Sequence, residues 1–168
     1  MAIKGLSNQE MKLASELEFK GNYYFTRKNI ALLFENEKQI TNTLYWLKKK
    51  ERIIKLNRSK YYFVPIKART GKWIDDITVA IDEILDGQDY FIGGWFAANY
   101  WRLTDQIPFQ ADVYTTRRQG KVKIFNMRII FHRTSKKNLK KAIVQKIQNH
   151  NFFILNKKEA QEWMKSRE

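Results

Sequence analysis

The chain of 168 residues contains no cysteine, only 2 prolines and 7 glycines, and only 2 histidines. The absence of cysteine excludes disulfide scaffolds, cysteine nucleophiles and thiolate zinc sites, and His132 and His150 are too few for a histidine-rich metal site. Because glycine and proline are scarce while 43% of the residues are hydrophobic, we expect a packed chain rather than a disordered one. The length is sufficient for one ordinary domain or two small ones.

Long apolar runs are also missing. No stretch approaches the roughly 18 apolar residues of a membrane span, and the segment Met1 to Gly5 lacks the apolar core of a signal peptide. We therefore expect a soluble, cytoplasmic protein that has no membrane partner.

Acidic residues are outnumbered by basic ones. The 32 Lys and Arg residues against 17 Asp and Glu give a formal net charge of +15 at pH 7. Residues 48–60 hold seven basic side chains and one acidic, and residues 117–141 hold ten basic and none acidic. Such clusters indicate a polyanionic partner, and a basic surface that serves only solubility is the alternative.

The apolar pattern is interrupted in the segment from Pro65 to Trp73, which contains Gly71. This interruption predicts two domains, residues 1–65 and residues 66–168.

The first domain is expected to begin with two helices. Ser7 and Glu10 have the spacing of a capping box, in which each side chain accepts a hydrogen bond from an amide left unpaired in the first turn. The helix that they start would end at Gly21 in a left-handed turn. Thr26 is then in position to cap a second helix.

A third helix is predicted from Asn36 or Glu37 to about Lys50. Its helical spacing predicts a buried stripe formed by Ile40, Leu44 and Leu47. Two β-prone runs around Asn57-Arg58-Ser59 follow and predict a hairpin. Three helices followed by a basic hairpin are typical of a winged helix-turn-helix.

The outward side of the third helix is the predicted DNA-contacting surface. An α-helix fits the major groove, where Asn and Gln can pair with adenine and Lys can contact guanine or phosphate. A basic hairpin would lie over phosphates or in the minor groove, and the start of the second helix offers further cations and unpaired amides. The predicted contact residues are Arg27, Lys28, Lys38, Gln39, Thr41, Asn42, Tyr45, Lys48, Lys49, Lys55, Arg58 and Lys60. The alternatives are a solvated helix face and lysines that protect an edge strand from aggregation.

The second domain is expected to be a small mixed α/β domain. Asp75 or Asp76 would cap a helix closed by Gly87, and a short strand at 90–92 would lead into a helix rich in small residues. The aromatic residues of that second helix are expected in the core: Trp95, Phe96, Tyr100 and Trp101.

Strands are predicted at about 109–116 and 122–132, joined by residues 117–121. Residues 139–148 fit either a helix or an alternating strand, and we favour the strand. A strand at 152–155 and a terminal helix beginning at Asn156 complete the domain.

The second basic cluster predicts a further binding surface at Arg117, Arg118, Lys121 and Lys123. It would either extend a nucleic-acid footprint or receive an acidic partner protein. A solvated sheet edge is the alternative.

No pattern in the chain predicts catalysis. A glycine-rich phosphate loop, a zinc-binding His/Glu spacing and a nucleophile elbow are all missing from the sequence. A metal-dependent nuclease would need convergent carboxylates, for which the chain offers Asp75, Asp76, Asp82, Glu83, Asp86 and Asp112. Because Asp75 and Asp76 are better explained as helix caps, we predict no enzyme activity, no metal site and no cofactor, with a nuclease as a minor alternative.

Three short segments of the second domain suggest a family. The run Tyr90-Phe91-Ile92-Gly93, then Ala97-Ala98, then Trp101-Arg102-Leu103-Thr104-Asp105-Gln106-Ile107-Pro108, resembles the central motif of the AbiEi abortive-infection antitoxins, which are transcriptional regulators. The similarity runs from about Ser7 to Glu162, although Arg102 stands where the family often has glycine.

The resemblance implies an N-terminal domain that binds DNA repeats and represses its own operon. It also implies a C-terminal domain that neutralises a cognate nucleotidyltransferase toxin, and it implies no catalytic residues.

The sequence as a whole predicts an α+β protein with an N-terminal winged helix-turn-helix followed by a small mixed α/β domain. Its expected function is sequence-specific binding of double-stranded DNA as a transcriptional repressor. Because helix-turn-helix proteins often bind two half-sites, a homodimer on DNA is also expected. The alternative is a protein-neutralising module that binds a toxin without a major role in DNA binding.

Overall fold

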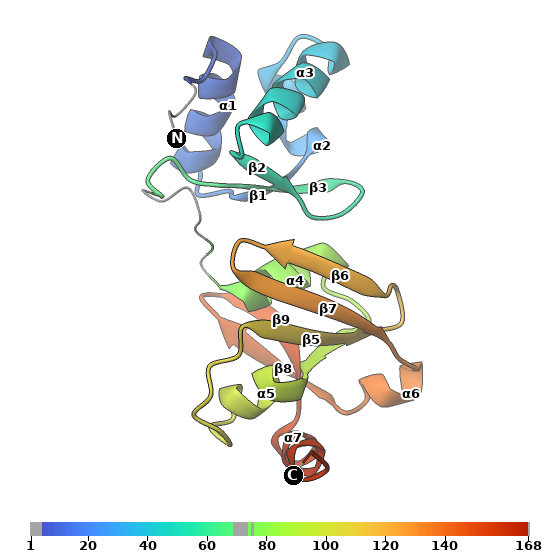
Figure 1. The fold of residues 1–168 in the computed structure, drawn as a ribbon. Helices are drawn as coiled ribbons and strands as arrows, with labels where there is room; N and C mark the ends of the chain where they lie inside the picture. Colours follow the sequence, from blue (N-terminus) through green and yellow to red (C-terminus); the bar gives the residue numbers. More distant parts are fainter. Residues whose placement is uncertain (1–4, 69–73, 75, 168) are drawn as a thin grey trace. The chain divides into compact units, whose positions relative to one another are not determined.

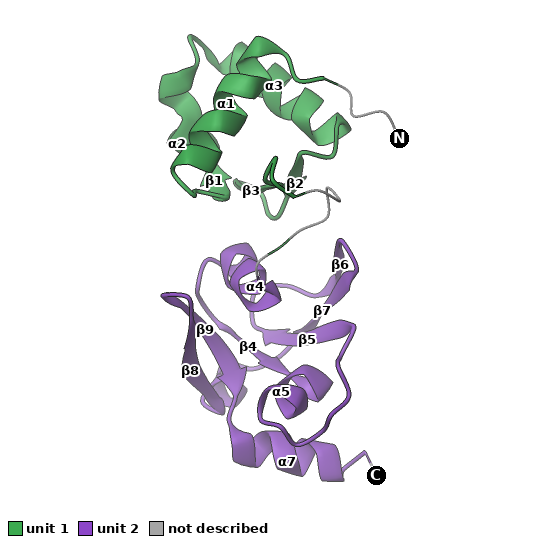
Figure 2. Cartoon of the chain, turned by 90° about the vertical axis from the view of Figure 1, so that its left-hand side faces the viewer, with its two compact units in different colours: residues 1–74 green, residues 75–168 purple. Residues whose placement is uncertain are grey.

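The computed structural model describes residues 5–68, 74 and 76–167. Over these residues the chain has seven α-helices and two β-sheets, which confirms the predicted α+β class. The chain divides into two compact units, residues 1–74 and residues 75–168 (Figure 2). The boundary predicted from the sequence lay at residues 65–66, and residues 69–73 fall outside the described part.

Unit 1 contains helices α1 (Asn8–Phe19), α2 (Arg27–Ile30) and α3 (Glu37–Lys49), and α2 continues into the 3-10 turn η1 (Ala31–Leu33) (Figure 1). The predicted start of each of these three helices is confirmed by its N-cap residue, which is Ser7, Thr26 and Asn36 in turn.

The capping box that opens α1 is complete. The Ser7 amide donates to Glu10 Oε2 at 2.7 Å, and the Glu10 amide donates to Ser7 Oγ at 3.3 Å. At the other end of the helix Gly21 has a φ of +60°, which confirms the left-handed turn expected there. Asn36 caps α3 by accepting from the Gln39 amide at 3.0 Å.

A buried ion pair connects the first and third helices of unit 1. Lys50 Nζ lies 2.6 Å from Glu10 Oε2, and the Glu10 side chain is only 3% exposed. Lys50 also donates to the Gly5 carbonyl at 2.9 Å. Lys50, the last residue of the basic run at 48–50, is therefore engaged in contacts within unit 1.

The sheet of unit 1 has three antiparallel strands in the order β1-β3-β2, namely β1 (Tyr24–Thr26), β2 (Ile53–Lys55) and β3 (Lys60–Phe63). The predicted hairpin is confirmed as β2 and β3. Strand β1 was not predicted, because three residues are too few to show a period and their pairing with β3 forms only in the folded chain. The core beneath the sheet includes Leu13, Leu17, Phe25, Ile30, Ile40, Leu44, Leu47 and Phe63.

Unit 2 is built on a six-stranded mixed sheet with the order β6-β7-β5-β4-β9-β8. Its strands are β4 (Tyr90–Gly93), β5 (Gln110–Thr115), β6 (Gly120–Ile124), β7 (Met127–Arg133), β8 (Ala142–Ile147) and β9 (His150–Leu155). Strands β5 and β7 run parallel, as do β4 and β9, and the other neighbours are antiparallel.

The predicted continuous strand at 122–132 is wrong. The chain reverses at Phe125 and Asn126, where Phe125 has a φ of +52°, and β6 pairs back on β7 with Ile124 opposite Met127. Apolar residues alternate on both sides of this turn, and no Gly or Pro marks it, so the pattern concealed the reversal. For the ambiguous segment the strand interpretation is confirmed by β8, which follows the short helix α6 (Lys136–Leu139).

Helices cover both faces of the unit 2 sheet (Figure 1). Helix α4 (Ile77–Leu85) lies on the face to which Tyr90 points, since the Tyr90 hydroxyl contacts Asp82 of that helix. Successive side chains of a strand point to opposite faces. Helices α5 (Gly94–Tyr100) and α7 (Lys157–Lys165) lie on the other face of the sheet, to which the side chain of Phe91 points. The N-caps Asp76 and Asn156 confirm the predicted starts of α4 and of the terminal helix.

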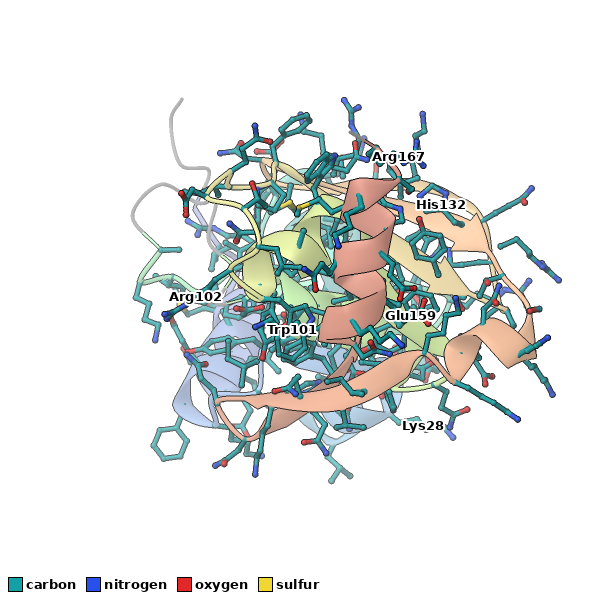
Figure 3. All side chains as sticks on the ribbon, turned by 90° about the horizontal axis from the view of Figure 1, so that it is seen from below. Lys28, Trp101, Arg102, His132, Glu159 and Arg167 are labelled. Atoms are coloured by element: carbon teal, nitrogen blue, oxygen red, sulfur yellow. The ribbon has the colours of Figure 1, made fainter. Side chains whose placement is uncertain are left out.

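The expectation that the aromatic residues of α5 are core is wrong in part. Trp95 and Tyr100 remain 40% and 37% exposed, whereas Ala97 and Ala98 are fully buried. The small residues let α5 approach the sheet closely, so its large rings lie at the sides of the helix. The half-buried Trp101 donates from Nε1 to the Leu155 carbonyl at 2.8 Å (Figure 3).

None of the helices in the described ranges has the length and apolar character that a membrane crossing requires.

Asp82 of α4 holds two side chains from the sheet. The Tyr90 hydroxyl donates to Asp82 Oδ1 at 2.6 Å, and His150 Nε2 lies 2.7 Å from Asp82 Oδ2. The Phe153 amide in turn donates to the Tyr90 oxygen at 3.3 Å. Burial, followed by the hydrogen bond to Asp82 and its negative charge, raises the pKa of Tyr90 well above its ordinary value of 10.0.

We expect this tyrosine to make stability depend on alkaline pH. The raised pKa in the folded chain means that the stabilising contribution is complete below pH 10.0 and is lost as the pH rises further. Tyr90→Phe should lower the free energy of unfolding by about 1–3 kcal/mol at pH 7. The difference from wild type should shrink above pH 10, as urea unfolding at several pH values would show. Ile92→Val, on the same strand, changes no ionisable group, so its free energy of unfolding should follow the same pH dependence as wild type. If the free energy of unfolding of Tyr90→Phe also ran parallel to wild type above pH 10, this expectation would be refuted.

Candidate nucleic-acid interface

Helix α3 presents a continuous polar and aromatic face to solvent. Lys38, Asn42, Tyr45 and Lys49 are all exposed, and their spacing places them within about 60° of one another around the helix axis. No acidic residue occurs between Lys38 and Lys50. The opposite side carries the predicted buried stripe, Ile40, Leu44 and Leu47, which are 2%, 5% and 0% exposed. The helix therefore hides its aliphatic side and leaves the predicted contact side free. We call these four residues the α3 face.

An exposed aromatic pair lies on the α3 face and beside it. Tyr45 and Trp46 are 53% and 54% exposed, and their rings meet edge to face with centroids 5.3 Å apart. Lys49 Nζ lies 5.6 Å from the centre of the Tyr45 ring. Trp46 was not among the predicted contact residues. The signal was present in the helical spacing, which places Trp46 about 70° from the centre of the α3 face and well away from the buried stripe.

Three of the predicted contact residues are engaged inside the unit. Arg27 Nη2 lies 3.1 Å from Glu37 Oε2 and also donates to Thr41 Oγ1. Gln39 donates to Glu35 Oε2 and accepts from the Glu35 amide, both at 3.1 Å. Glu35 and Glu37 lie close in sequence to the predicted contact residues, and their negative charge disfavours a phosphate at the start of α3. Arg27, Gln39 and Thr41 would have to exchange these contacts for any contact with DNA.

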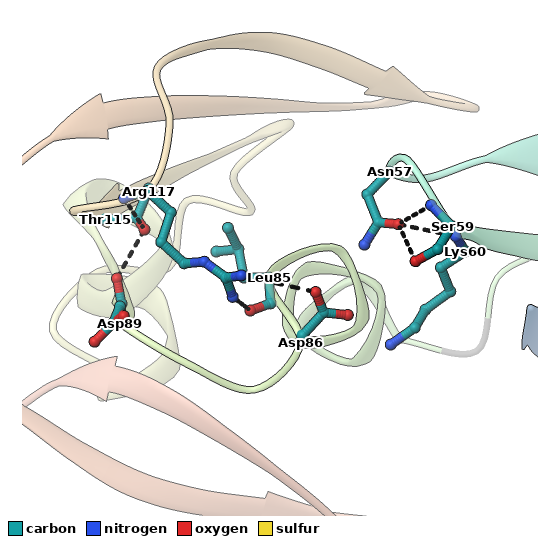
Figure 4. A network of polar contacts seen from close by, with 8 residues as sticks. All are labelled: Asn57, Ser59, Lys60, Leu85, Asp86, Asp89, Thr115 and Arg117. Carbon is teal, nitrogen blue, oxygen red and sulfur yellow. Dashed lines mark hydrogen bonds and ion pairs between the residues drawn. The ribbon is translucent and has the colours of Figure 1, made fainter.

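The turn between β2 and β3 holds Arg58 at its tip. Asn57 Oδ1 accepts from the Ser59 amide at 3.0 Å and from the Lys60 amide at 2.8 Å, and the Leu56 amide donates to the Lys60 carbonyl at 2.9 Å (Figure 4). An Asn side chain that bonds backbone amides in this way stabilises a turn. Arg58 is thus an exposed cation on a well-defined turn.

The remaining predicted cations differ in how far they are available. Lys60 is half-buried and has contacts of its own. Within the part of unit 1 that the structure describes, six predicted cations are exposed and have no ion-pair or hydrogen-bond partner for their side chains: Lys28, Lys38, Lys48, Lys49, Lys55 and Arg58. Five of these, all but Lys28, belong to α3 and the hairpin that follows its C-terminal end.

The second predicted surface is only partly free. Arg117 donates to the Leu85 carbonyl at the end of α4 and lies 3.9 Å from Asp86 Oδ2 (Figure 4), a favourable place for a cation at a helix C-terminus. The Arg118 guanidinium lies 4.4 Å from the centre of the Phe131 ring. Lys121 and Lys123 are exposed on β6, an edge strand of the sheet.

The carboxylates that a nuclease would need lie apart in their own contacts. Asp76 accepts from the Thr78 amide at 2.7 Å as the cap of α4, and Asp75 lies outside the described residues. Asp82 contacts Tyr90 and His150, and Asp112 Oδ1 lies 2.8 Å from His132 Nε2. Among the residues whose positions are described, no three His, Asp or Glu side chains come together as ligands for a metal ion.

In comparisons with protein-family models and with curated proteins, no match to this chain is found. The resemblance to the AbiEi antitoxins, which depends on residues 90–108, stays a prediction.

Proposed function

We propose that unit 1 is a winged helix-turn-helix that binds double-stranded DNA, and that the chain acts as a sequence-specific transcriptional repressor. The observation that carries the proposal is the α3 face, with Lys38, Asn42, Tyr45 and Lys49 exposed on one side of a helix whose other side is buried. The order of three helices followed by a basic hairpin in a small antiparallel sheet supports the same assignment.

The dimensions of α3 suit the major groove. At 1.5 Å per residue, Lys38 and Lys49 are separated by roughly 16 Å along the helix axis. The major groove is about 12 Å wide, so a helix lying across it would bring the two lysines near the phosphates on either side. Asn42 and Tyr45, between them, would then face the base edges. Asn42 can pair with adenine, and the Tyr45 ring can contact a thymine methyl group.

The hairpin adds a second contact with the duplex. Arg58 at the turn and Lys55 on β2 are exposed and lie beyond the C-terminal end of α3. A guanidinium on a turn can lie against a phosphate or enter a narrow minor groove, where the potential is more negative. In this proposal the helix discriminates between bases, and the hairpin contributes affinity that depends little on sequence.

The test is the salt dependence of binding by the full chain to labelled duplex DNA. Each neutralised phosphate contributes about −0.9 to the slope of log affinity against log salt. With four cations in contact, the affinity should fall roughly 100-fold between about 50 and 200 mM salt. An affinity that stays constant over this range would contradict DNA binding.

Selection of bound duplexes from a random pool tests the sequence specificity separately. We expect a common motif to emerge, and we expect two half-sites bound by two copies of the chain. A pool that shows no enrichment would refute the repressor assignment even if salt-dependent binding is found.

A further inference from the structure

Unit 2 has a cavity of about 450 Å³, open to solvent on one side, on the face of the sheet that α7 covers. Its walls come from β4, β5, the end of β7 and the chain that follows it, and α7, which crosses this face in Figure 3. Small-molecule sites in proteins have volumes of about 300–1,000 Å³. The cavity is therefore large enough for a ligand, and all of its lining residues belong to unit 2.

One side of the cavity is aromatic. Phe91 and Tyr114, directly paired across β4 and β5, are stacked with ring centroids 5.1 Å apart and planes 14° apart. On its other side the Tyr114 ring is stacked on His132 of β7, with centroids 4.9 Å apart, so a ligand would meet the edge of Tyr114 and not its faces. Trp163 of α7 contributes a third ring, held edge-on by Trp95 of α5 with centroids 5.3 Å apart. An apolar cavity of about 150 Å³ holds a benzene ring. This cavity has room for a ring together with a short polar group.

The polar side offers donors without partners. Arg133 is an exposed lining residue, and within the described ranges its guanidinium has no hydrogen bond or ion pair. The Tyr114 hydroxyl likewise has no hydrogen-bond partner there. Burial, followed by the charge of Asp112, raises the pKa of Tyr114, which keeps this hydroxyl protonated as a donor.

The other charged lining residues limit the charge of a ligand. Lys141 Nζ is already paired with Glu159 Oε2 at 2.8 Å. Glu162 is exposed, and its carboxylate is unpaired among the residues the structure describes. A dianion such as a phosphate would be repelled by Glu162, and among the described residues that line the cavity only Arg133 is a cation without an ion pair. Arg167 lies outside the lining, with its guanidinium 5.4 Å from the centre of the Trp163 ring. A single carboxylate matches one guanidinium, with which it can form two parallel hydrogen bonds.

We propose that the cavity of unit 2 binds a small aromatic carboxylate, whose ring packs against Phe91, Trp163 and the edge of Tyr114 and whose carboxylate pairs with Arg133. Two sources share this chemistry, aromatic amino acids and aromatic acids that lack the amino group. Glu162 distinguishes them, because its carboxylate can accept from an ammonium group. The proposal goes beyond DNA binding and does not depend on it.

Calorimetric titration of the full chain tests the proposal with four probes: phenyllactate, phenylpyruvate, phenylalanine and benzyl alcohol. The two acids without an amino group should bind, and benzyl alcohol, which has the ring but neither a carboxylate nor an ammonium group, should not. Tighter binding of phenylalanine than of phenyllactate would identify amino acids as the preferred source, and the reverse order would identify the other acids. If no carboxylate probe binds at about 10 mM, or if benzyl alcohol binds as well as the acids, the proposal is wrong.

Variants locate the binding. Arg133→Ala should weaken binding of the carboxylates by about 10-fold or more, because a hydrogen-bonded charge pair is lost. Arg128→Ala removes an exposed cation from the same strand outside the cavity lining and should bind as wild type does. Glu162→Gln should change the affinity for phenylalanine and leave the affinities for phenyllactate and phenylpyruvate unchanged. The indole N–H resonance of Trp163 should shift on titration, and its constancy, or wild-type affinity in Arg133→Ala, would overturn the proposal.

Discussion

Replacing both Lys49 and Arg58 by alanine is expected to weaken binding to every DNA duplex by about 10- to 100-fold at moderate salt. Both side chains are exposed, and neither has an ion-pair or hydrogen-bond partner within the described part of unit 1. Their loss should therefore remove phosphate contacts without disturbing the fold. The slope of log affinity against log salt should become shallower by about 2, since two fewer counterions are released. Fluorescence anisotropy on specific and random duplexes, over a series of salt concentrations, measures both quantities.

Two single variants separate the causes of this loss. Lys20→Ala removes an exposed cation at the end of α1, which pairs with Glu16, and should leave affinity and slope close to wild type. Asn42→Ala removes no charge, so it should reduce the preference for the selected site by about 10-fold while binding to random duplexes stays unchanged. An equal loss in Lys20→Ala and in the double variant would mean that general charge, and not the α3 face with the hairpin, causes the binding.

Gly94→Ala is expected to destabilise unit 2 by about 2–4 kcal/mol. Gly94 has a φ of +60°, which is unfavourable for a residue with a Cβ atom, and an added Cβ would lie 2.8 Å from Asp112 Oδ2 and 3.2 Å from Asp112 Cβ. Asp112 cannot easily move away, because its Oδ1 lies 2.8 Å from His132 Nε2 and 3.2 Å from Gln110 Nε2. Both backbone strain and overlap should therefore contribute. Urea-dependent hydrogen exchange of the β5 amides reports on unit 2 directly.

Gly87→Ala is the matched control for backbone strain. Gly87 has a φ of +68°, but the nearest atom to an added Cβ is Asp82 Oδ2 at 3.7 Å, an ordinary contact distance. This variant should lose only about 1 kcal/mol. The difference between the stability losses of the two variants measures the cost of the overlap with Asp112. Adding Asp112→Ala to the Gly94→Ala variant should reduce that cost. Equal losses at Gly87 and Gly94 would show that overlap contributes nothing.

The helix starts could be predicted because the interactions that decide them are local. Ser7, Asn36, Asp76 and Asn156 each accept from an amide two or three residues further along the chain. A cap of this kind is visible in a short window of sequence. The reversal at Phe125 left no such mark, since its neighbours continue the alternation that a strand requires.

The α3 face was predictable for a related reason. Periodicity shows which side of a helix is apolar, and hence that Asn42, Tyr45 and Lys49 point to solvent. It does not show which polar residues find partners. Arg27 and Gln39 were expected to be free for contact with DNA, but Glu37 and Glu35 engage them in the folded unit.

The sequence by itself determined the mixed α+β class, the starts of the helices and the side that α3 turns to solvent, because each follows from contacts or periods within a few residues. Only the tertiary structure decided that Lys50 is paired with Glu10, 40 residues away, and that Arg117 caps α4 through the carbonyl of Leu85, 32 residues away. It alone assembled the cavity of unit 2 from separate strands and α7. Contacts between residues so distant along the chain depend on how the elements pack, and no local pattern records them.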